Sequence, residues 1–488
     1  MPMLFHLENE IYDTMIVPSD WRFSAAITGL MRYFTDQHME GRYAVQYHSV
    51  PEQDFDDECL LFYWSDLTEN RYLQFVTHFF RDDLPLCQLK ELLEVPRKLS
   101  DDEIESANGL LAFNAIMKKV FPKVKYTEEN RESIRQRLME QADSLIKETY
   151  RNKKNLYANF ANPNCLGKDS DDVCRLWGYY VDVSRKGKSL GYGFDKNKMT
   201  VQDSLIFDFI PFAFQGGREQ YFIHNNLSIR EMVALNDQFH VLAEKMESDA
   251  KKENKLLNDR KIFWSFITKL MSVQAFDVEV IAKNLDEGFF RPLFVRRESV
   301  EILKQLAKRT ENDKQIYDAF TWSYTPDNGK TYLDIQKITI ESVLNLNVLD
   351  SWIEYFLREE LHDKSRNFDY LIHCWIGINL QIRHGGGKEN MRKEAKSAYQ
   401  CAQKVRAQLK GKDKQNKLDM YITKLTSSVI SHDYQQVCDI LLQLSNYTGI
   451  YFNFAYSLYE DFEENKDIIY TFITALRRTP VEEADGQA

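Results

Sequence analysis

The spacing of apolar residues changes part-way along the chain, and this change constrains the fold more than any other feature. Up to about residue 335, short apolar runs suited to strands, such as Cys59–Trp64, are mixed with amphipathic helical stretches. From about Lys337 onward the spacing is helical and strand-like runs fade. The turn-rich segment Tyr324–Lys330 (YTPDNGK) lies between the two parts. The sequence therefore predicts an α+β fold, with a mixed N-terminal domain over residues 1–335 and an all-α helical bundle over residues 336–488.

Helix-capping residues and apolar runs place several elements more closely. Trp21–Phe34 has the spacing of an amphipathic helix. The capping box Ser228-Ile-Arg-Glu231 predicts a helix that reaches about Lys252. Leu205–Phe214 is apolar and aromatic, which predicts a core strand. Gly216-Gly217-Arg218 then turns the chain into a second strand at Tyr221–His224.

The composition is that of a globular protein without a membrane segment. The 488 residues are 43% hydrophobic and 13% aromatic, which suits two or three domains with their own cores. The first residues lack the pattern of a signal peptide, and no apolar stretch approaches the ~18 residues of a membrane helix. Seven scattered cysteines predict a reduced, cytoplasmic protein. The net charge of −11 argues against a uniformly basic surface but allows local basic patches.

A basic segment punctuated by glycines precedes the apolar run at Leu205–Phe214. Lysine and arginine supply positive charge there, while glycine lets the backbone approach a ligand closely, which favours contact with a phosphate backbone. The candidate nucleic-acid-binding residues of this central segment are Lys186, Lys188, Lys196, Lys198 and Arg218. The alternative is a solvated hairpin beside a core strand.

A second aromatic and basic element lies at Phe289–Arg297 (FFRPLFVRR). Aromatic rings can stack on bases, and neighbouring arginines can hold phosphates, so Arg291, Arg296 and Arg297 are further candidates. The alternative is an edge strand with solvated ends.

The helical region contains a strongly basic stretch. After Gly385-Gly386-Gly387, one apolar stripe is expected on a helix, formed by Met391, Ala395, Ala398, Ala402, Val405 and Leu409. Lys388–Lys424 contains eleven basic and four acidic residues, a local charge of +7 in a chain of −11. A solvated helix face is the ordinary explanation, but this excess favours nucleic-acid binding. The candidates here are Lys393, Lys396, Lys404, Arg406 and Lys410.

Known catalytic and metal-binding patterns are absent from the sequence. Gly187-Lys188-Ser189 lacks the first glycine of a phosphate-binding loop, and Cys165 and Cys174 form one loose pair where a zinc site needs four ligands. Asp203 and Asp208 flank the apolar run, and on a strand they would point to opposite faces. We therefore expect a binding protein that is not an enzyme and has no cofactor or metal. The alternatives are a metal-dependent nuclease, or another nucleic-acid-processing enzyme, built on Asp203 and Asp208, and a helical scaffold without a nucleic-acid role.

Two segments resemble a known family. Lys417–Arg478 has a helix, a short polar turn before an aromatic residue, a leucine-rich helix and a closing aromatic helix. These features lie at Leu418–Ile430, His432-Asp433-Tyr434, Val437–Leu444, and Phe462 with Tyr470, Phe472 and Leu476. This arrangement, with the central GKSLGYGFD and FDFIPFAF, resembles the large subunit (Cas8 family, type I-B-like) of the type I CRISPR surveillance complex, Cascade. Members of one branch carry paired CxxC motifs, which this sequence lacks.

The resemblance implies a non-catalytic subunit of a complex that carries a CRISPR RNA (crRNA). Its N-terminal part would contact the crRNA 5′ end and the protospacer-adjacent motif (PAM) of target double-stranded DNA. Its helical bundle would guide the displaced strand of the R-loop. The implied protein partners are the other Cascade backbone subunits and a helicase-nuclease recruited in trans; no membrane is implied.

The glycines before the basic helix permit one further hypothesis. Gly385-Gly386-Gly387 is encoded by GGN codons, which can spell a ribosome-binding site three codons before Met391. Translation from Met391 would give a small subunit of 98 residues, Met391–Ala488. The alternative is that the glycines only end one helix and link it to the next.

Overall fold

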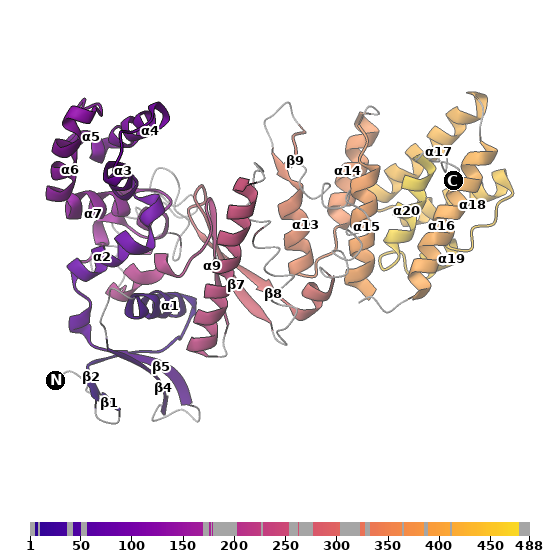
Figure 1. The fold of residues 1–488 in the computed structure, drawn as a ribbon. Coiled ribbons are helices and arrows are strands. Elements are labelled where there is room, and N and C mark those ends of the chain that lie inside the picture. Colours follow the sequence, from indigo (N-terminus) through magenta and orange to yellow (C-terminus); the bar gives the residue numbers. More distant parts are fainter. Residues whose placement is uncertain are drawn as a thin grey trace, which may run out of the picture. The chain divides into compact units, whose positions relative to one another are not determined.

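The computed structural model describes residues 5–7, 10–36, 42–49, 56–168, 175–176, 178, 203–225, 228–252, 262, 277–302, 323–326, 332–363, 366–384, 389–409 and 412–477. The chain divides into two units (Figure 1). Unit 1 comprises Met1–Ile267 and Val278–Leu293, and unit 2 comprises Thr268–Asp277 and Phe294–Ala488. The division predicted at residues 335 and 336 falls inside unit 2, where β10 (Leu333–Asp334) is followed by α13 (Ile335–Leu344).

Unit 1 mixes helices with short antiparallel sheets. Its strands are β1 (Phe5–Leu7), β2 (Glu10–Tyr12), β3 (Thr14–Ile16), β4 (Tyr43–Ser49), β5 (Asp56–Phe62), β6 (Glu219–His224), β7 (Val278–Asn284) and the first four residues of β8 (Phe290–Val295). Its α-helices are α1 (Trp21–Thr35), α2 (Glu69–Phe79), α3 (Pro85–Glu94), α4 (Asp101–Leu111), α5 (Ala115–Val120), α6 (Arg131–Glu140), α7 (Ala142–Asn152), α8 (Tyr157–Phe160) and α9 (Ile229–Lys252). Short 3₁₀ helices are η1 (Trp64–Asp66), η2 (Arg81–Asp83), η3 (Glu128–Asn130), η4 (Pro163–Cys165) and η6 (Leu205–Phe212).

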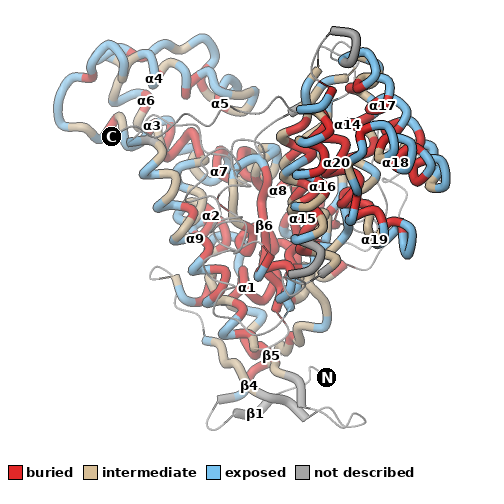
Figure 2. Tube along the Cα trace, turned by 90° about the vertical axis from the view of Figure 1, so that its right-hand side faces the viewer, coloured by how far each residue is buried: buried red, intermediate tan, exposed pale blue. Residues whose placement is uncertain are grey.

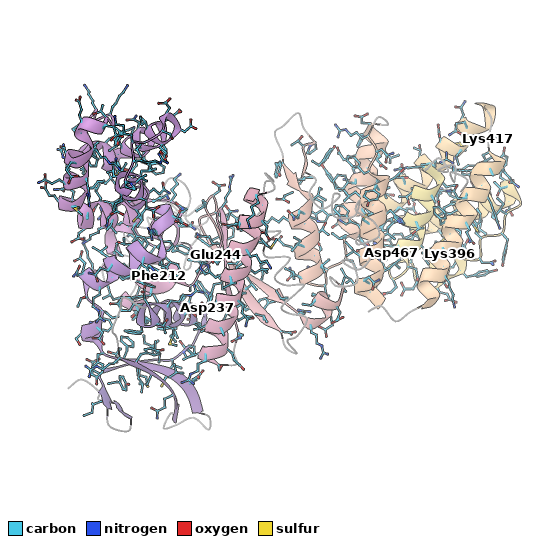
Figure 3. The ribbon with its side chains drawn as sticks, viewed as in Figure 1. Phe212, Asp237, Glu244, Lys396, Lys417 and Asp467 are labelled. Atoms are coloured by element: carbon cyan, nitrogen blue, oxygen red, sulfur yellow. The ribbon has the colours of Figure 1, made fainter. Side chains whose placement is uncertain are left out.

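The core of unit 1 forms where α1 crosses η6. Asp20 caps α1 by accepting a hydrogen bond from the Arg22 N–H at 2.7 Å, as a residue at this position should. Gly29 lets the two elements touch, because a Cβ there would lie 2.1 Å from the Phe209 carbonyl oxygen. The Arg32 guanidinium donates to the carbonyl oxygen of Phe212, which Figure 3 labels. The N-terminal helix predicted at Trp21–Phe34 is therefore confirmed as α1.

The strand predicted at Leu205–Phe214 is wrong, because Leu205–Phe212 is the 3₁₀ helix η6. Every side chain from Ile206 to Phe212 is buried, so the run shows no periodicity that could separate a helix from a strand. Pro211 has no N–H to give to a sheet, which disfavours a central strand. The following strand, predicted at Tyr221–His224, is confirmed as β6.

Two three-stranded sheets, ordered β3–β5–β4 and β6–β7–β8, complete unit 1. β4 and β5 pair antiparallel, with Val45 opposite Leu60. Because successive side chains on a strand point to opposite faces, Leu60 and Phe62 join the main core. Cys59 and Leu61 pack in a small separate cluster. β6 and β7 also pair antiparallel, and this pairing fixes the surroundings of several candidate residues.

Unit 2 is dominated by helices. Its elements are β9 (Ser323–Tyr324), β10 and α13, then α14 (Asp350–His362), α15 (Asp369–His384), α16 (Glu389–Gln408), α17 (Lys412–Ile430), α18 (Tyr434–Thr448), α19 (Ala455–Glu460) and α20 (Lys466–Arg477). α20 lies at the centre and packs on α15, α16 and α17, and its residues are buried almost throughout (Figure 2). The predicted α+β fold with a C-terminal helical bundle is confirmed.

A buried polar cluster joins three helices of the bundle. The Arg383 guanidinium reaches both Asp350 at the start of α14 and Asp467 in the first turn of α20. The Asn379 side chain donates to Asp350 at 2.8 Å and to Asp467 at 3.1 Å. Burial raises the pKa of Asp467 to about 6, although Arg383 opposes this shift. These contacts fix α14, α15 and α20 against one another.

Candidate nucleic-acid interface

Five of the predicted binding residues lie outside the described residues. They are Lys186, Lys188, Lys196, Lys198 and Lys410. The geometry of the remaining eight falls into two groups, one around β6 and β8 and the other on α16.

Arg218 stands at the exposed turn before β6. Its Nε donates to the Asp286 carboxylate at 3.1 Å, and both side chains are largely in solvent. This hydrogen bond raises the pKa of the Arg218 guanidinium. Exposed ion pairs are weak, so a phosphate can exchange for Asp286 at little cost. Arg218 is therefore placed where a nucleic-acid backbone could reach it.

Arg291 is held inside the fold. Its Nη2 donates to Glu219 Oε1 at 2.7 Å, and the Glu219 side chain is 6% exposed. A buried carboxylate needs a charged partner to remain ionised, and Arg291 supplies that partner. Most of the Arg291 charge is thus balanced by β6, so its first role is to fix β8 within the sheet.

Arg296 and Arg297 are exposed just after β8, where the chain turns into a helical segment. The carbonyl oxygen of Arg296 accepts from the Val300 N–H at 3.1 Å, which starts that segment. The Arg297 N–H donates to Asp277 Oδ1 at 3.0 Å. These backbone bonds leave both side chains at the surface, available to a ligand.

On α16 the apolar stripe is as predicted over the described side chains. Ala398, Ala402 and Val405 are fully buried against α20, and Ala395 and Leu409 are also buried. Met391 lies in the first turn of α16.

The lysines of α16 project on the opposite side of the helix. Lys393, Lys396 and Lys404 are exposed (Figure 3 labels Lys396). At 100° per residue they lie within a sector of about 80°, and Lys393 and Lys404 are about 16 Å apart along the axis. The three side chains therefore form one cationic face two to three turns long, which we call the α16 lysine face.

Arg406 differs from these lysines because it caps a neighbouring helix. Its Nη1 donates to the Leu476 carbonyl oxygen at 3.1 Å, in the last turn of α20. Gln403 Nε2 also donates a hydrogen bond to α20, to the Ala475 carbonyl oxygen at 3.2 Å. Burial lowers the pKa of the Arg406 guanidinium, although Asp369 and Asp419 oppose this shift. The C-terminal carbonyls of a helix lack partners within it, so Arg406 satisfies one of them.

A cavity of about 410 Å³ opens beside Arg406. Its wall carries two more guanidiniums, Arg366 and Arg477, together with carboxylates that include Glu360 and Asp419. Arg477 is itself ion-paired with Glu360. Because charges of both signs line this cavity, it does not have the uniformly positive wall that a phosphate backbone favours.

Asp203 and Asp208 are both engaged in holding the core of unit 1. Asp203 Oδ2 accepts from the backbone N–H groups of Arg175 and Leu176 at 3.0 and 3.1 Å. The Asp208 carboxylate is buried, forms an ion pair with Arg175 and accepts from the Gly167 N–H at 2.8 Å. Burial raises the pKa of Asp208, and Arg175 opposes this shift.

Neither aspartate therefore presents an open carboxylate to a metal ion. Among the described residues, no group of three or more His, Cys, Asp or Glu side chains could hold one. Cys165 is a buried free thiol, and Cys174 lies outside the described residues.

Sequence reasoning missed two features of the bundle. Lys417 on α17, which Figure 3 labels, donates from Nζ to the Tyr447 hydroxyl at 3.0 Å, and this nitrogen lies 4.5 Å from the centre of that ring. Several tyrosines in and around α18 and α19 are exposed, among them Tyr451 in the connection between the two helices and Tyr456 in α19. The sequence does carry a signal for this surface. The stretch between Lys424 and Lys466 contains these tyrosines and has no lysine or arginine.

The family model for CRISPR-associated protein Csx8 matches residues 12–476. The chain belongs to the Csx8 family of CRISPR-associated proteins. The match runs through nearly the whole of both units and confirms the resemblance to the CRISPR large-subunit family. No curated protein and no solved structure matches the chain.

Membership of the Csx8 family gives the chain a role in a CRISPR system. Within the described part of the chain, no helix combines the length and the apolar character that crossing a bilayer requires.

Proposed function

We propose that this chain is the non-catalytic large subunit of a type I CRISPR interference complex. It binds crRNA and target double-stranded DNA, recognises the protospacer-adjacent motif, stabilises the R-loop and recruits a separate helicase-nuclease. The other Cascade backbone subunits are its protein partners in the cytoplasm. Membership of the Csx8 family supports this proposal, as does the resemblance of Lys417–Arg478 to the end of such large subunits.

The α16 lysine face is the observation that carries the nucleic-acid part of the proposal. Lys393, Lys396 and Lys404 gather on one side of one helix in a chain whose net charge is −11. Phosphate contacts supply affinity without reading sequence, and pairing with a guide RNA supplies specificity. A guide-bearing complex therefore needs positive charge only where the strand passes.

Side-chain exposure and hydrogen-bond partners support a division of the predicted set into proposed contacting residues and proposed positioning residues. Lys393, Lys396 and Lys404, with Arg218, Arg296 and Arg297, have exposed side chains and are proposed as phosphate contacts. Arg406 holds α20 against α16, and Arg291 holds β8 through Glu219. In this proposal these two arginines place the contact surfaces.

We propose a non-catalytic protein because the two candidate metal ligands, Asp203 and Asp208, are engaged within the core of unit 1. Asp203 Oδ2 accepts from two backbone N–H groups, and the Asp208 carboxylate is held by Arg175 and by the Gly167 N–H. A metal-dependent nuclease needs such oxygens open to the ion and its water. Cleavage of DNA therefore falls to the recruited helicase-nuclease.

An internal translation start at Met391 is also part of the proposal. The start would lie in the first turn of α16, which begins at Glu389. The product would contain nearly all of α16 and the whole of α17 to α20. It would carry the α16 lysine face as a separate small subunit.

Charge reversal on the α16 lysine face tests the nucleic-acid role. The double variant Lys396→Glu/Lys404→Glu is compared with Lys98→Glu/Lys154→Glu, which reverses two exposed lysines of unit 1. Binding of the purified complex to fluorescent target DNA is measured between 50 and 200 mM salt. We expect the α16 variant to weaken binding and to lower the slope of log K against log salt by about 2. Equal effects from both variants would contradict a localised interface.

A further inference from the structure

The end of the bundle formed by α18 and α19 has a chemistry opposite to that of the α16 lysine face. No lysine or arginine occurs between Lys424 and Lys466, and six acidic residues do. These are Asp433, Asp439, Glu460, Asp461, Glu463 and Glu464. Phosphate groups would be repelled here, so this surface does not suit nucleic acid.

Large apolar side chains are exposed on the same surface. Tyr451 is 65% exposed, Tyr456 is 57% exposed and Tyr459 is 43% exposed. We call the set Tyr451, Tyr456 and Tyr459 the tyrosine face. Figure 2 shows exposed residues along α18 and α19. Scattered apolar residues at a surface need no explanation, but a cluster marks an interaction site.

The tyrosines form a connected group. The rings of Tyr451 and Tyr456 lie 6.2 Å apart, and those of Tyr456 and Tyr459 lie 6.5 Å apart at 89°. The hydroxyls of Tyr451 and Tyr456 also form a hydrogen bond. Burial, together with Cys438 and Asp439 of α18, raises the pKa of the Tyr459 hydroxyl. Two acidic residues, Glu460 and Asp461, directly follow Tyr459 in the chain.

Packing beneath the surface fixes these rings in place. The segment after α18 alternates, with Phe452 and Phe454 buried against Phe472 while Tyr451 points outward. Gly449 ends α18 with φ of 68°, and the Ser445 hydroxyl donates to the Ile450 carbonyl oxygen at 2.6 Å. A rigid, pre-formed aromatic surface loses little entropy on binding, which suits a docking site.

We propose that the tyrosine face docks a protein partner whose contact surface is rich in arginine and lysine. Tyrosine is enriched where proteins bind each other, and arginine stacks on tyrosine rings. The acidic residues Asp439, Glu460 and Asp461 complement the positive charge of such a partner. The bundle thus holds nucleic acid on one helix face and a protein subunit on another. This inference rests on the proposed function, because it places the partner in the same complex.

Site-specific photo-crosslinking in the complex purified from native cells tests this inference. A benzoylphenylalanine replaces Tyr456, and a matched variant replaces Tyr399, an exposed tyrosine of α16. We expect Tyr456 to crosslink to another protein molecule, within a peptide that carries several arginines or lysines. A crosslink from Tyr456 to RNA or DNA, to an acidic peptide, or to nothing outside its own chain would overturn the proposal.

A second measurement separates this inference from the proposed nucleic-acid role. Native mass spectrometry of Tyr451→Ser/Tyr456→Ser should show the docked partner retained about tenfold less, with bound RNA unchanged. Tyr399→Ser should keep the partner. Lys396→Glu/Lys404→Glu should lose nucleic acid but keep the partner. If the tyrosine variant keeps the partner while the lysine variant loses nucleic acid, the docking proposal fails and the proposed function stands.

Discussion

Arg291 of β8 donates to Glu219 of β6 across the central sheet of unit 1, from Nη2 to Oε1 at 2.7 Å. The Glu219 side chain is almost entirely buried. Arg218, one residue before Glu219, forms its own ion pair with Asp286 in solvent. Two arginines that look alike in sequence thus have different roles, one inside the sheet and one at its surface.

Substitution of each arginine should separate these roles. Arg291→Ala leaves the buried Glu219 carboxylate without its partner, so we expect a loss of about 3 kcal/mol in the free energy of unfolding, measured by urea denaturation. Arg218→Ala should leave the melting temperature nearly unchanged and lower the salt slope of DNA binding by about 1. Equal destabilisation by the two variants would contradict this division.

Gly29 should be essential to the contact between α1 and η6. In Gly29→Ala the new Cβ would lie 2.1 Å from the Phe209 carbonyl oxygen, so both elements must move apart. We expect a loss of about 3 kcal/mol or more in the free energy of unfolding. Gly109→Ala in α4 is the matched control, because nothing lies within 4 Å of its Cβ. That variant should gain about 0.5–1 kcal/mol, since alanine favours helix.

Asp467 should make the stability of the bundle depend on pH. Its pKa is about 6 in the folded chain, above the usual value of 3.8, so the folded state binds the proton more tightly than the unfolded state. The stabilisation that Asp467 contributes is therefore fully present below pH 3.8, is lost as the pH rises through 6, and levels off about one pH unit above that. Burial raises the pKa of Asp350 as well, which acts in the same direction.

Comparison with Asp467→Asn isolates this effect. The asparagine does not titrate, so the stability of the original chain relative to the variant should fall by about 2 kcal/mol between pH 4 and pH 6. Urea denaturation at pH 4, 5, 6 and 7 measures the difference. A difference that is constant over this range, or that rises with pH, would show that Asp467 does not titrate as described.

Met391→Ile should remove the proposed small subunit without affecting the full-length chain. Intact-mass analysis of the purified complex should find Met391–Ala488 in the original and not in the variant. The free fragment should also melt at a lower temperature than the full chain. In the fragment Asp467 loses Arg383, and Tyr470 loses the Glu354 carboxylate to which its hydroxyl donates at 2.8 Å. Detection of full-length chain only, with Met391 unchanged, would rule out the internal start.

The sequence predicted elements well where local signals decide the structure. Trp21–Phe34 and Met391–Leu409 have clear helical spacing, and Ser228 caps α9 by accepting from the Glu231 N–H at 3.0 Å. Leu205–Phe212 was predicted wrongly because burial on every side removes the periodicity that distinguishes helix from strand.

The candidate site could be predicted only in part, because the partner of each charged side chain depends on the tertiary fold. Nothing near Arg291 in sequence points to Glu219, which lies 72 residues away. Arg406 donates to the Leu476 carbonyl oxygen at the end of α20, 70 residues further along the chain. Lys404, two residues before Arg406, faces solvent. Sequence therefore located the cationic helix but could not tell which of its charges the fold itself uses.

Co-purification from native cells tests the central claim most directly. The chain is tagged at its C-terminus, and the bound RNA and the masses of the bound proteins are measured together. A large subunit of a crRNA complex should bring down short RNA of uniform length and several partner subunits. Recovery of the full-length chain by itself, free of RNA and of partners, would contradict the account.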